Sequence, residues 1–132
     1  IETTAGNRSV TFNIAINYGG RHEILQACKS IAKLVRAGEL DPHQIDESLF
    51  TQYLDTQGLP DPDLLIRTSG KQRLSNFLLW QLAYTEFVFV DTYWPDFDRS
   101  VLEGAIAEYR ARERRFGGLS KRSSGLSPVM PT

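Results

Sequence analysis

The spacing of apolar residues changes period along the first third of the chain. Residues Val10–Asn17 are rich in β-branched side chains and alternate with period two, which predicts a strand that Gly19-Gly20 ends. From Arg21 to Ala37 the apolar residues recur at helical spacing, and Gly38 is placed to end that helix. The apolar face of this predicted helix consists of Ile24, Leu25, Cys28, Ile31, Ala32 and Val35. We expect Cys28 to be an inert core thiol.

The later pattern predicts five further elements. Asp41-Pro42 begins a second amphipathic helix, because Asp is a favoured cap and Pro a favoured first helical residue. Short apolar runs predict buried strands at Asp63–Ile66 and Phe87–Asp91, with a buried helix at Asn76–Ala83 between them. Asp98 is placed to cap a last helix.

This order of elements predicts an α/β fold with a mainly parallel sheet covered by helices on both faces. The three predicted strands are few for such a sheet, so we expect only its later strands in this chain. Ile1–Asn7 resembles a helix end that runs into a loop, and residues 1–119 are expected to be the C-terminal part of one longer domain. Residues 120–132 are rich in Ser, Pro and Gly, which predicts a disordered tail.

Composition argues against several classes of function. The chain of 132 residues has a net charge of −1, which gives no general reason to bind nucleic acid or an anionic membrane. No stretch approaches the ~20 apolar residues of a membrane span. The single cysteine excludes an internal disulfide and is typical of a protein in a reducing cytoplasm.

Two polar clusters follow predicted strands, at the position where open parallel sheets bind ligands. Tyr18-Gly19-Gly20-Arg21 follows the first strand, and Arg67-Thr68-Ser69-Gly70 follows the second. Glycine lets the backbone approach an anion, and arginine can grip phosphate oxygens through two bonds. Arg73 and Ser75 come shortly afterwards and could meet the same anion. Surface ion pairing is the simpler interpretation of the first cluster, whereas the second cluster with these two residues predicts an anion site.

The central segment resembles a known family, the cis-prenyltransferases. The matching motifs are Asp63–Gly70 (DLLIRTSG), Arg73–Gln81 (RLSNFLLWQ), Tyr84, Glu86 and Trp94–Phe97 (WPDF). A preceding family motif resembles Asn17–Arg21 with Glu23-Ile24, and a C-terminal one resembles Arg112–Gly118. These motifs together cover most of the chain.

The resemblance implies a Mg²⁺-dependent enzyme that condenses isopentenyl diphosphate with an allylic diphosphate, commonly farnesyl diphosphate, and makes each new double bond cis. Arg67, Arg73 and Ser75 match residues that hold the diphosphate of isopentenyl diphosphate, and Glu86 matches a Mg²⁺-associated carboxylate. Arg115-Phe116-Gly117 resembles a terminal motif that completes the active site of the neighbouring subunit in a dimer. A cytoplasmic homodimer is therefore expected, with at most peripheral membrane contact through its lipid product.

Three features depart from the family pattern. The family's essential aspartate lies in an N-terminal half that nothing here matches, because Asp91 and Asp96 belong to another motif, so the isolated chain is expected to be inactive. Lys71 stands where the family usually has Glu, and we expect a retained fold with altered affinity. Glu86 begins its predicted strand, which places it at the sheet edge away from Arg67 unless the backbone is irregular or Glu86 serves a site across the dimer interface.

Two alternative functions stay open. A non-catalytic partner subunit could supply the C-terminal motif to a catalytic homologue, and Lys71 slightly favours that interpretation. The retained anion-binding residues argue against it, because a pure scaffold need not keep them. A generic phosphate-binding α/β module would explain the loops but not the long central motif.

Overall fold

The computed structural model describes Gly6 and residues 9–112, which divide into two compact units. Unit 1 comprises the residues up to Pro62 together with Arg73–Ala83. Unit 2 comprises Asp63–Gln72 together with the residues from Tyr84 onward. In the described part of the chain, no helix combines the length and the hydrophobicity that a membrane span requires.

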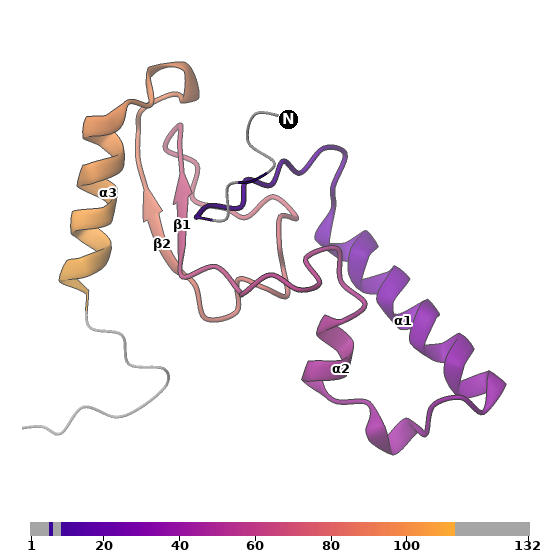
Figure 1. The fold of residues 1–132 in the computed structure, drawn as a ribbon. Helices are drawn as coiled ribbons and strands as arrows, with labels where there is room; N and C mark the ends of the chain where they lie inside the picture. Colours follow the sequence, from indigo (N-terminus) through magenta and orange to yellow (C-terminus); the bar gives the residue numbers. More distant parts are fainter. Residues whose placement is uncertain (1–5, 7–8, 113–132) are drawn as a thin grey trace, which may run out of the picture. The chain divides into compact units, whose positions relative to one another are not determined.

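The long helix of unit 1, α1, spans Gly20–Ala37 and confirms the predicted helix (Figure 1). It ends where Gly38 adopts a left-handed backbone with φ of 74°, and the N–H of Gly38 donates to the carbonyl of Val35 at 3.1 Å. Its buried face includes Ala27 and Ile31. Cys28 lies beside that face and is exposed, so the prediction of a core thiol is wrong. It borders an open apolar groove of about 470 Å³.

The predicted second helix is interrupted. A short 3-10 helix spans Pro42–Gln44, and helix α2 spans Glu47–Thr51. The Asp41 side chain accepts from the N–H of His43 at 2.9 Å, as predicted for a cap. The Asp46 side chain then accepts from the N–H of Leu49 at 2.8 Å and begins a new helix. Two competing caps therefore produce two short helices instead of one.

Residues Val10–Asn17 do not form the predicted strand. The sheet found among the described residues has two strands, and neither comes from this segment. The side chains of Val10, Phe12 and Ile16 are 80%, 82% and 81% exposed. A strand is stabilised by a hydrogen-bonded neighbour and by burial of one face, and the described part of unit 1 supplies neither for this segment.

The apolar segment Asn76–Ala83 folds into consecutive turns and not into the predicted helix. Ser75, Asn76 and Leu78 have left-handed backbones, with φ of 52°, 65° and 44°, which a right-handed helix does not allow. The segment nevertheless contributes Gln81 and Leu82 to the core of unit 1. The other buried side chains of this core include Glu23, Ala27, Ile31 and Leu54.

Unit 2 contains a parallel pair of strands, β1 at Leu64–Arg67 and β2 at Glu86–Phe89. Helix α3 at Arg99–Ala111 contacts β2 (Figure 1), and the Asp98 side chain caps it as predicted by accepting from the N–H of Val101 at 3.0 Å. A 3-10 turn at Trp94–Asp96 precedes this helix. The fully buried side chain of Val88 lies at the centre of this unit's core, with Ala105 of α3 also buried.

The predicted α/β class with a parallel sheet is confirmed, and two of the three predicted strands form with bounds shifted by no more than two residues. The predicted tail at residues 120–132 lies outside the described residues.

Candidate functional site

The register of the two strands places Arg67 and Glu86 at opposite ends of the sheet. Leu64 pairs with Glu86, and Arg67 pairs with Phe89. At ~3.3 Å per residue, the two pairs are separated by about 10 Å along the strands. The prediction that Glu86 lies at the edge away from Arg67 is therefore confirmed.

The loop that follows Arg67 is hydrogen-bonded to the chain that follows β2. The N–H of Val90 donates to the carbonyl of Arg67 at 2.9 Å, and the N–H groups of Ser69 and Gly70 donate to the carbonyls of Thr92 and Val90, both at 3.0 Å. These backbone donors therefore serve the protein itself. The side chain of Arg67, which is half-buried, is a cation at the start of this loop that can attract an anion.

Gly70 lies so close to the carboxylate of Asp91 that a side chain at this position would clash with it. Its backbone is left-handed, with φ of 61°, and an added Cβ would lie 2.9 Å from Oδ1 of Asp91. Asp91 therefore faces this loop from the end of the neighbouring strand. The glycine that the sequence suggested for approach to an anion instead accommodates an acidic side chain.

The three predicted diphosphate-binding residues are divided between the units. Arg67 belongs to unit 2, whereas Arg73 and Ser75 belong to unit 1, where both are exposed. Lys71 is exposed in unit 2. A single site formed by all three residues stays a prediction.

The N-terminus of α1 is occupied by Asn76 and does not present free donors at its first two residues. The N–H of Gly20 donates to the carbonyl of Asn76 at 2.7 Å, and the N–H of Arg21 donates to its Oδ1 at 2.9 Å. The cluster Tyr18–Arg21, for which an anion site was not the preferred interpretation, therefore does not offer these two groups to an anion. Asn76, from the same unit, accepts hydrogen bonds from both N–H groups instead.

A buried carboxylate that the sequence did not single out as a site, Glu23, connects three parts of unit 1. It is 3% exposed and accepts hydrogen bonds from the Tyr18 hydroxyl and, at 2.7 Å, from the N–H of Asp55. The Nε2 of Gln81 lies 3.2 and 3.3 Å from its two oxygens and 2.9 Å from Oγ1 of Thr56. Burial and the hydrogen bond to Glu23 raise the pKa of Tyr18. The network therefore holds α1 to two distant segments.

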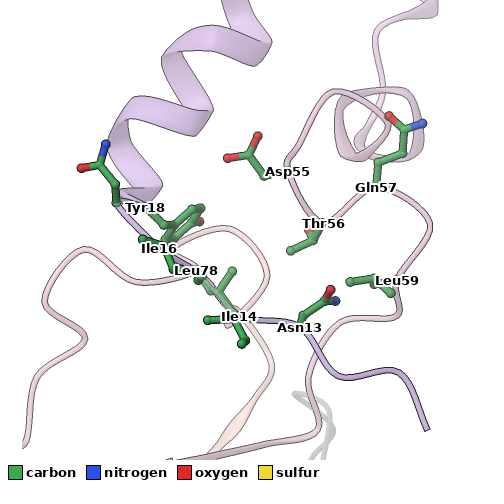
Figure 2. Close-up of a pocket in the computed structure, with 11 residues that line it drawn as sticks. Asn13, Ile14, Ile16, Tyr18, Asp55, Thr56, Gln57, Leu59 and Leu78 are labelled. Atoms are coloured by element: carbon green, nitrogen blue, oxygen red, sulfur yellow. The ribbon is translucent and has the colours of Figure 1, made fainter. Parts of the chain in front are cut away.

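An open pocket of about 480 Å³ lies beside this network, and Tyr18, Asp55 and Thr56 line it (Figure 2). The remaining lining residues are Asn13, Ile14, Ala15, Ile16, Asn17, Gln57, Leu59 and Leu78. None of these described residues is basic, and the side chain of Asp55 is acidic. The pocket therefore does not suit a diphosphate, which cationic side chains recognise best.

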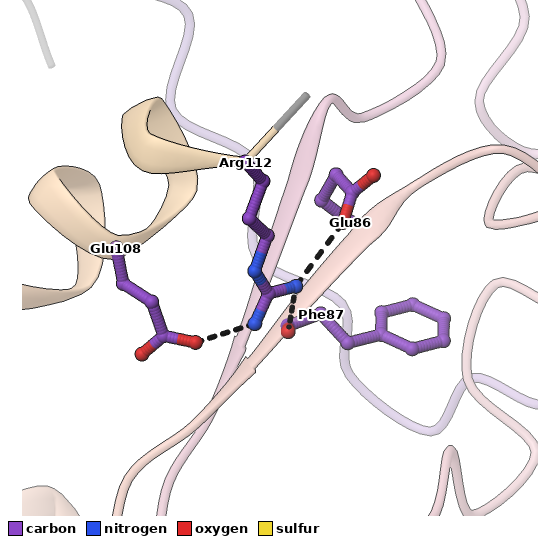
Figure 3. A network of polar contacts seen from close by, with 4 residues as sticks. All are labelled: Glu86, Phe87, Glu108 and Arg112. Carbon is purple, nitrogen blue, oxygen red and sulfur yellow. Dashed lines mark hydrogen bonds and ion pairs between the residues drawn. The ribbon is translucent and has the colours of Figure 1, made fainter. Parts of the chain in front are cut away.

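In unit 2, Arg112 holds Glu86 at the start of β2 (Figure 3). Nη1 of Arg112 donates to Oε2 of Glu86 at 3.1 Å and to the carbonyl of Phe87 at 2.7 Å, while Nη2 donates to Glu108. The bonds to Glu86 and then to Glu108 raise the pKa of Arg112 above its ordinary value. The i,i+4 spacing of Glu108 and Arg112 was visible in the sequence, but the contact with Glu86 was not.

The carboxylate of Glu86 fits a cation as one protein ligand among several. In the part of the chain that the structure describes, no group of three or more His, Cys, Asp or Glu residues could hold a metal alone. Mg²⁺ usually takes one or two carboxylates and completes its shell with water and substrate phosphates. Glu86 is compatible with that pattern, and its metal role stays a prediction. Arg115 and Gly117 lie outside the described residues.

Comparison with known proteins identifies the family. The sequence profile described as "Putative undecaprenyl diphosphate synthase" matches residues 1–117. An isoprenyl transferase from Chlorobaculum tepidum is 55% identical over 92% of this chain and 46% of its own length. A decaprenyl diphosphate synthase from Mycobacterium leprae is 54% identical over 86% of this chain and 38% of its own.

A solved structure agrees with these matches. The lavandulyl diphosphate synthase of Lavandula x intermedia, in complex with dimethylallyl diphosphate, is 47% identical and superposes with a TM-score of 0.82 over 88% of this chain and 50% of its own. The chain spans about half the length of the curated relatives it matches. It belongs to the undecaprenyl diphosphate synthase family of prenyltransferases, which confirms the resemblance inferred from its motifs.

Proposed function

We propose that this chain is part of a cis-prenyltransferase that condenses isopentenyl diphosphate with an allylic diphosphate such as farnesyl diphosphate. The observation that carries the proposal is the 55% identity to an isoprenyl transferase over 92% of the chain. The structural similarity to a synthase solved with an allylic diphosphate supports the same substrate class. In this proposal the enzyme is a homodimer, and Arg115-Phe116-Gly117 completes the site of the neighbouring subunit.

The diphosphate of isopentenyl diphosphate would bind to Arg67, Arg73 and Ser75. Two guanidinium groups and a hydroxyl supply charge-assisted and neutral donors to its oxygens. The position of Arg67 at the carboxyl end of β1 supports this role, because parallel sheets bind ligands at that edge. The exposure of Arg73 and Ser75 supports access by a ligand. Lys71 adds a further cation beside this loop and would strengthen the attraction.

The reaction needs charge stabilisation and orientation. The allylic carbon–oxygen bond breaks, and its electron pair leaves with diphosphate. The alkene electrons of isopentenyl diphosphate form the new carbon–carbon bond, and a proton leaves the adjacent carbon. By binding the diphosphate, the residues named above would hold the alkene of isopentenyl diphosphate against the allylic carbon. This orientation lowers the barrier by reducing the entropy that must be lost during the reaction. Cationic groups aimed at the departing diphosphate lower the barrier where negative charge develops.

Glu86 would hold Mg²⁺, which when bound supplies positive charge at a diphosphate. The hydrogen bonds from Arg112 fix the direction of the Glu86 carboxylate. Because Glu86 and Arg67 lie at opposite ends of the sheet, we infer that Glu86 serves the site across the subunit interface.

The test is incorporation of labelled isopentenyl diphosphate by the full-length protein with farnesyl diphosphate and Mg²⁺. We expect Arg67→Ala to raise the KM for isopentenyl diphosphate by about tenfold or more, the size of one lost charge-assisted hydrogen bond. Arg36→Ala is the matched control, because Arg36 is exposed in the last turn of α1. Equal small effects of both changes would contradict the assignment. No incorporation until a homologue is added would favour the non-catalytic partner subunit.

A further inference from the structure

Asn76 caps a helix that begins far away in the sequence. At its N-terminus, α1 has the cap residue Gly19, which has no side chain to accept a hydrogen bond. Asn76 supplies that acceptor from 55 residues away, with Oδ1 accepting from Arg21 and its carbonyl accepting from Gly20. Two N–H groups that a helix start leaves without intrahelical partners are therefore satisfied by one residue.

The two glycines at this helix start are needed for the close approach of this segment. An added Cβ on Gly19 would lie 2.9 Å from Nδ2 of Asn76. On Gly20 it would lie 3.0 Å from Cγ of Leu79, 3.1 Å from its N and 3.3 Å from the carbonyl oxygen of Asn76. The glycine pair and Asn76 therefore form one fitted contact, in which a larger side chain on either glycine would push the segment away.

The same contact sets the backbone beside a predicted substrate residue. Ser75 and Asn76 are consecutive and both left-handed, with φ of 52° and 65°. Asn tolerates this conformation better than Ser does, and a strained backbone persists only where surrounding contacts determine it. The two hydrogen bonds of Asn76 are such contacts. They therefore hold the backbone from which the Ser75 side chain leaves.

A second attachment keeps the segment from shifting along α1. Gln81 is 2% exposed, and its amide nitrogen binds Glu23 and Thr56. The segment is thus bound to the first turn of α1 at both of its ends, by Asn76 and by Gln81. With the far end held, a change at Asn76 acts on the near end, where Arg73 and Ser75 lie.

We propose that Asn76 is a positioning residue that holds Ser75, and the loop back to Arg73, in the conformation that binds the diphosphate of isopentenyl diphosphate. This inference rests on the proposed function. Asn76 does not touch the substrate in this account. It acts through the backbone, by capping α1 and fixing the left-handed turn.

The experiment measures KM for each substrate and kcat in the full-length enzyme. We expect Asn76→Ala to raise the KM for isopentenyl diphosphate by about tenfold, with the KM for the allylic substrate within about twofold of the wild-type value. Asn76→Gly keeps the carbonyl bond and allows the left-handed turn, so it is expected to raise the same KM by only about threefold. Because glycine allows the turn, Asn76→Gly still tests the proposal if Asn76→Ala does not fold.

Leu82→Ala is the control for general loosening, because Leu82 is 4% exposed in the same segment but makes none of the contacts to Gly20 or Arg21. It should lower Tm while leaving the KM for isopentenyl diphosphate unchanged. The proposal is overturned if Asn76→Ala leaves this KM unchanged while Ser75→Ala raises it, and the proposed function then still stands. If Ser75→Ala and Arg73→Ala also have no effect, the diphosphate assignment fails as well.

Discussion

Two glutamates, one in each unit, are held in opposite ways. Glu23 in unit 1 is 3% exposed, and it accepts hydrogen bonds from uncharged donors of Tyr18, Asp55 and Gln81. Glu86 in unit 2 has a side chain that is 31% exposed and pairs with Arg112. An enclosed carboxylate cannot leave its donors without orphaning them, whereas a half-exposed one can exchange a cationic side chain for a metal ion. Glu23 therefore serves the fold of unit 1, whereas Glu86 is the carboxylate for which we propose the metal role.

The largest expected effect comes from removing the buried carboxylate. Glu23→Ala leaves the Tyr18 hydroxyl and the N–H of Asp55 without this acceptor, and the Gln81 amide keeps only its bond to Thr56. We expect the free energy of unfolding to fall by about 3 kcal/mol, because each orphaned buried donor keeps its desolvation cost. Urea denaturation of the full-length protein measures the change. Glu39→Ala is the matched control, since Glu39 is exposed just beyond α1, and similar losses for both variants would contradict the comparison.

The second-largest effect is expected from Glu86, whose substitution should change the dependence of activity on Mg²⁺. Glu86→Gln keeps the shape of the side chain but removes its charge, so we expect the Mg²⁺ concentration for half-maximal incorporation to rise about tenfold, the scale of changes around metal sites. Stability should change by less than about 1 kcal/mol, because the ion pair with Arg112 is partly exposed. A large loss of stability with an unchanged Mg²⁺ requirement would instead show that Glu86, like Glu23, serves the fold and not the metal.

A smaller effect is expected from the cation that pairs with Glu86. Arg112→Lys keeps a positive charge but loses the planar fork that reaches Glu86, Glu108 and the carbonyl of Phe87 together. We expect a small loss in the free energy of unfolding, which is reduced further at high salt. Arg99→Lys is the control, because the pair of Arg99 with Glu103 is far more exposed, with side chains 90% and 61% accessible. Equal losses for the two variants would show that Arg112 forms only an ordinary surface pair.

Local sequence signals correctly predicted helix ends and the strands of unit 2. Gly38 ends α1 and Asp98 begins α3, because a left-handed glycine and a capping carboxylate act on residues within one turn. The strands of unit 2 were also predicted from short apolar runs. Each of these features depends on neighbours in the sequence, so the pattern alone was sufficient.

The features that the sequence missed depend on distant residues. The turn at Ser75–Asn76 replaces a helix because Asn76 binds the start of α1, and the burial of Glu23 depends on Gln81, 58 residues later. Apolar periodicity does not record such hydrogen bonds, and a charged residue is expected on the surface by default. The opposite placement of Arg67 and Glu86 was predictable because strand direction determines it. Their partners were not.

The smallest effect is a test of the Glu23 network at high pH. Burial first, and the hydrogen bond to Glu23 second, raise the pKa of Tyr18 above its ordinary value of ~10. The folded state then keeps the phenol proton at a pH where the unfolded chain releases it. This contribution to stability is therefore complete below pH ~10 and is lost as pH rises further. We expect Tyr18→Phe to cost about 1 kcal/mol at neutral pH, as for one buried hydrogen bond.

Above pH ~10 the gap between the wild-type protein and Tyr18→Phe should narrow, because the variant has no phenol to ionise. Urea denaturation at neutral pH and at two alkaline values measures this convergence. Tyr84→Phe is the control, because Tyr84 is 77% exposed, and its stability should follow the wild-type curve. If Tyr18→Phe instead runs parallel to the wild-type curve throughout, the hydroxyl of Tyr18 does not depend on Glu23, and Glu23 loses one of the donors that distinguish it from Glu86.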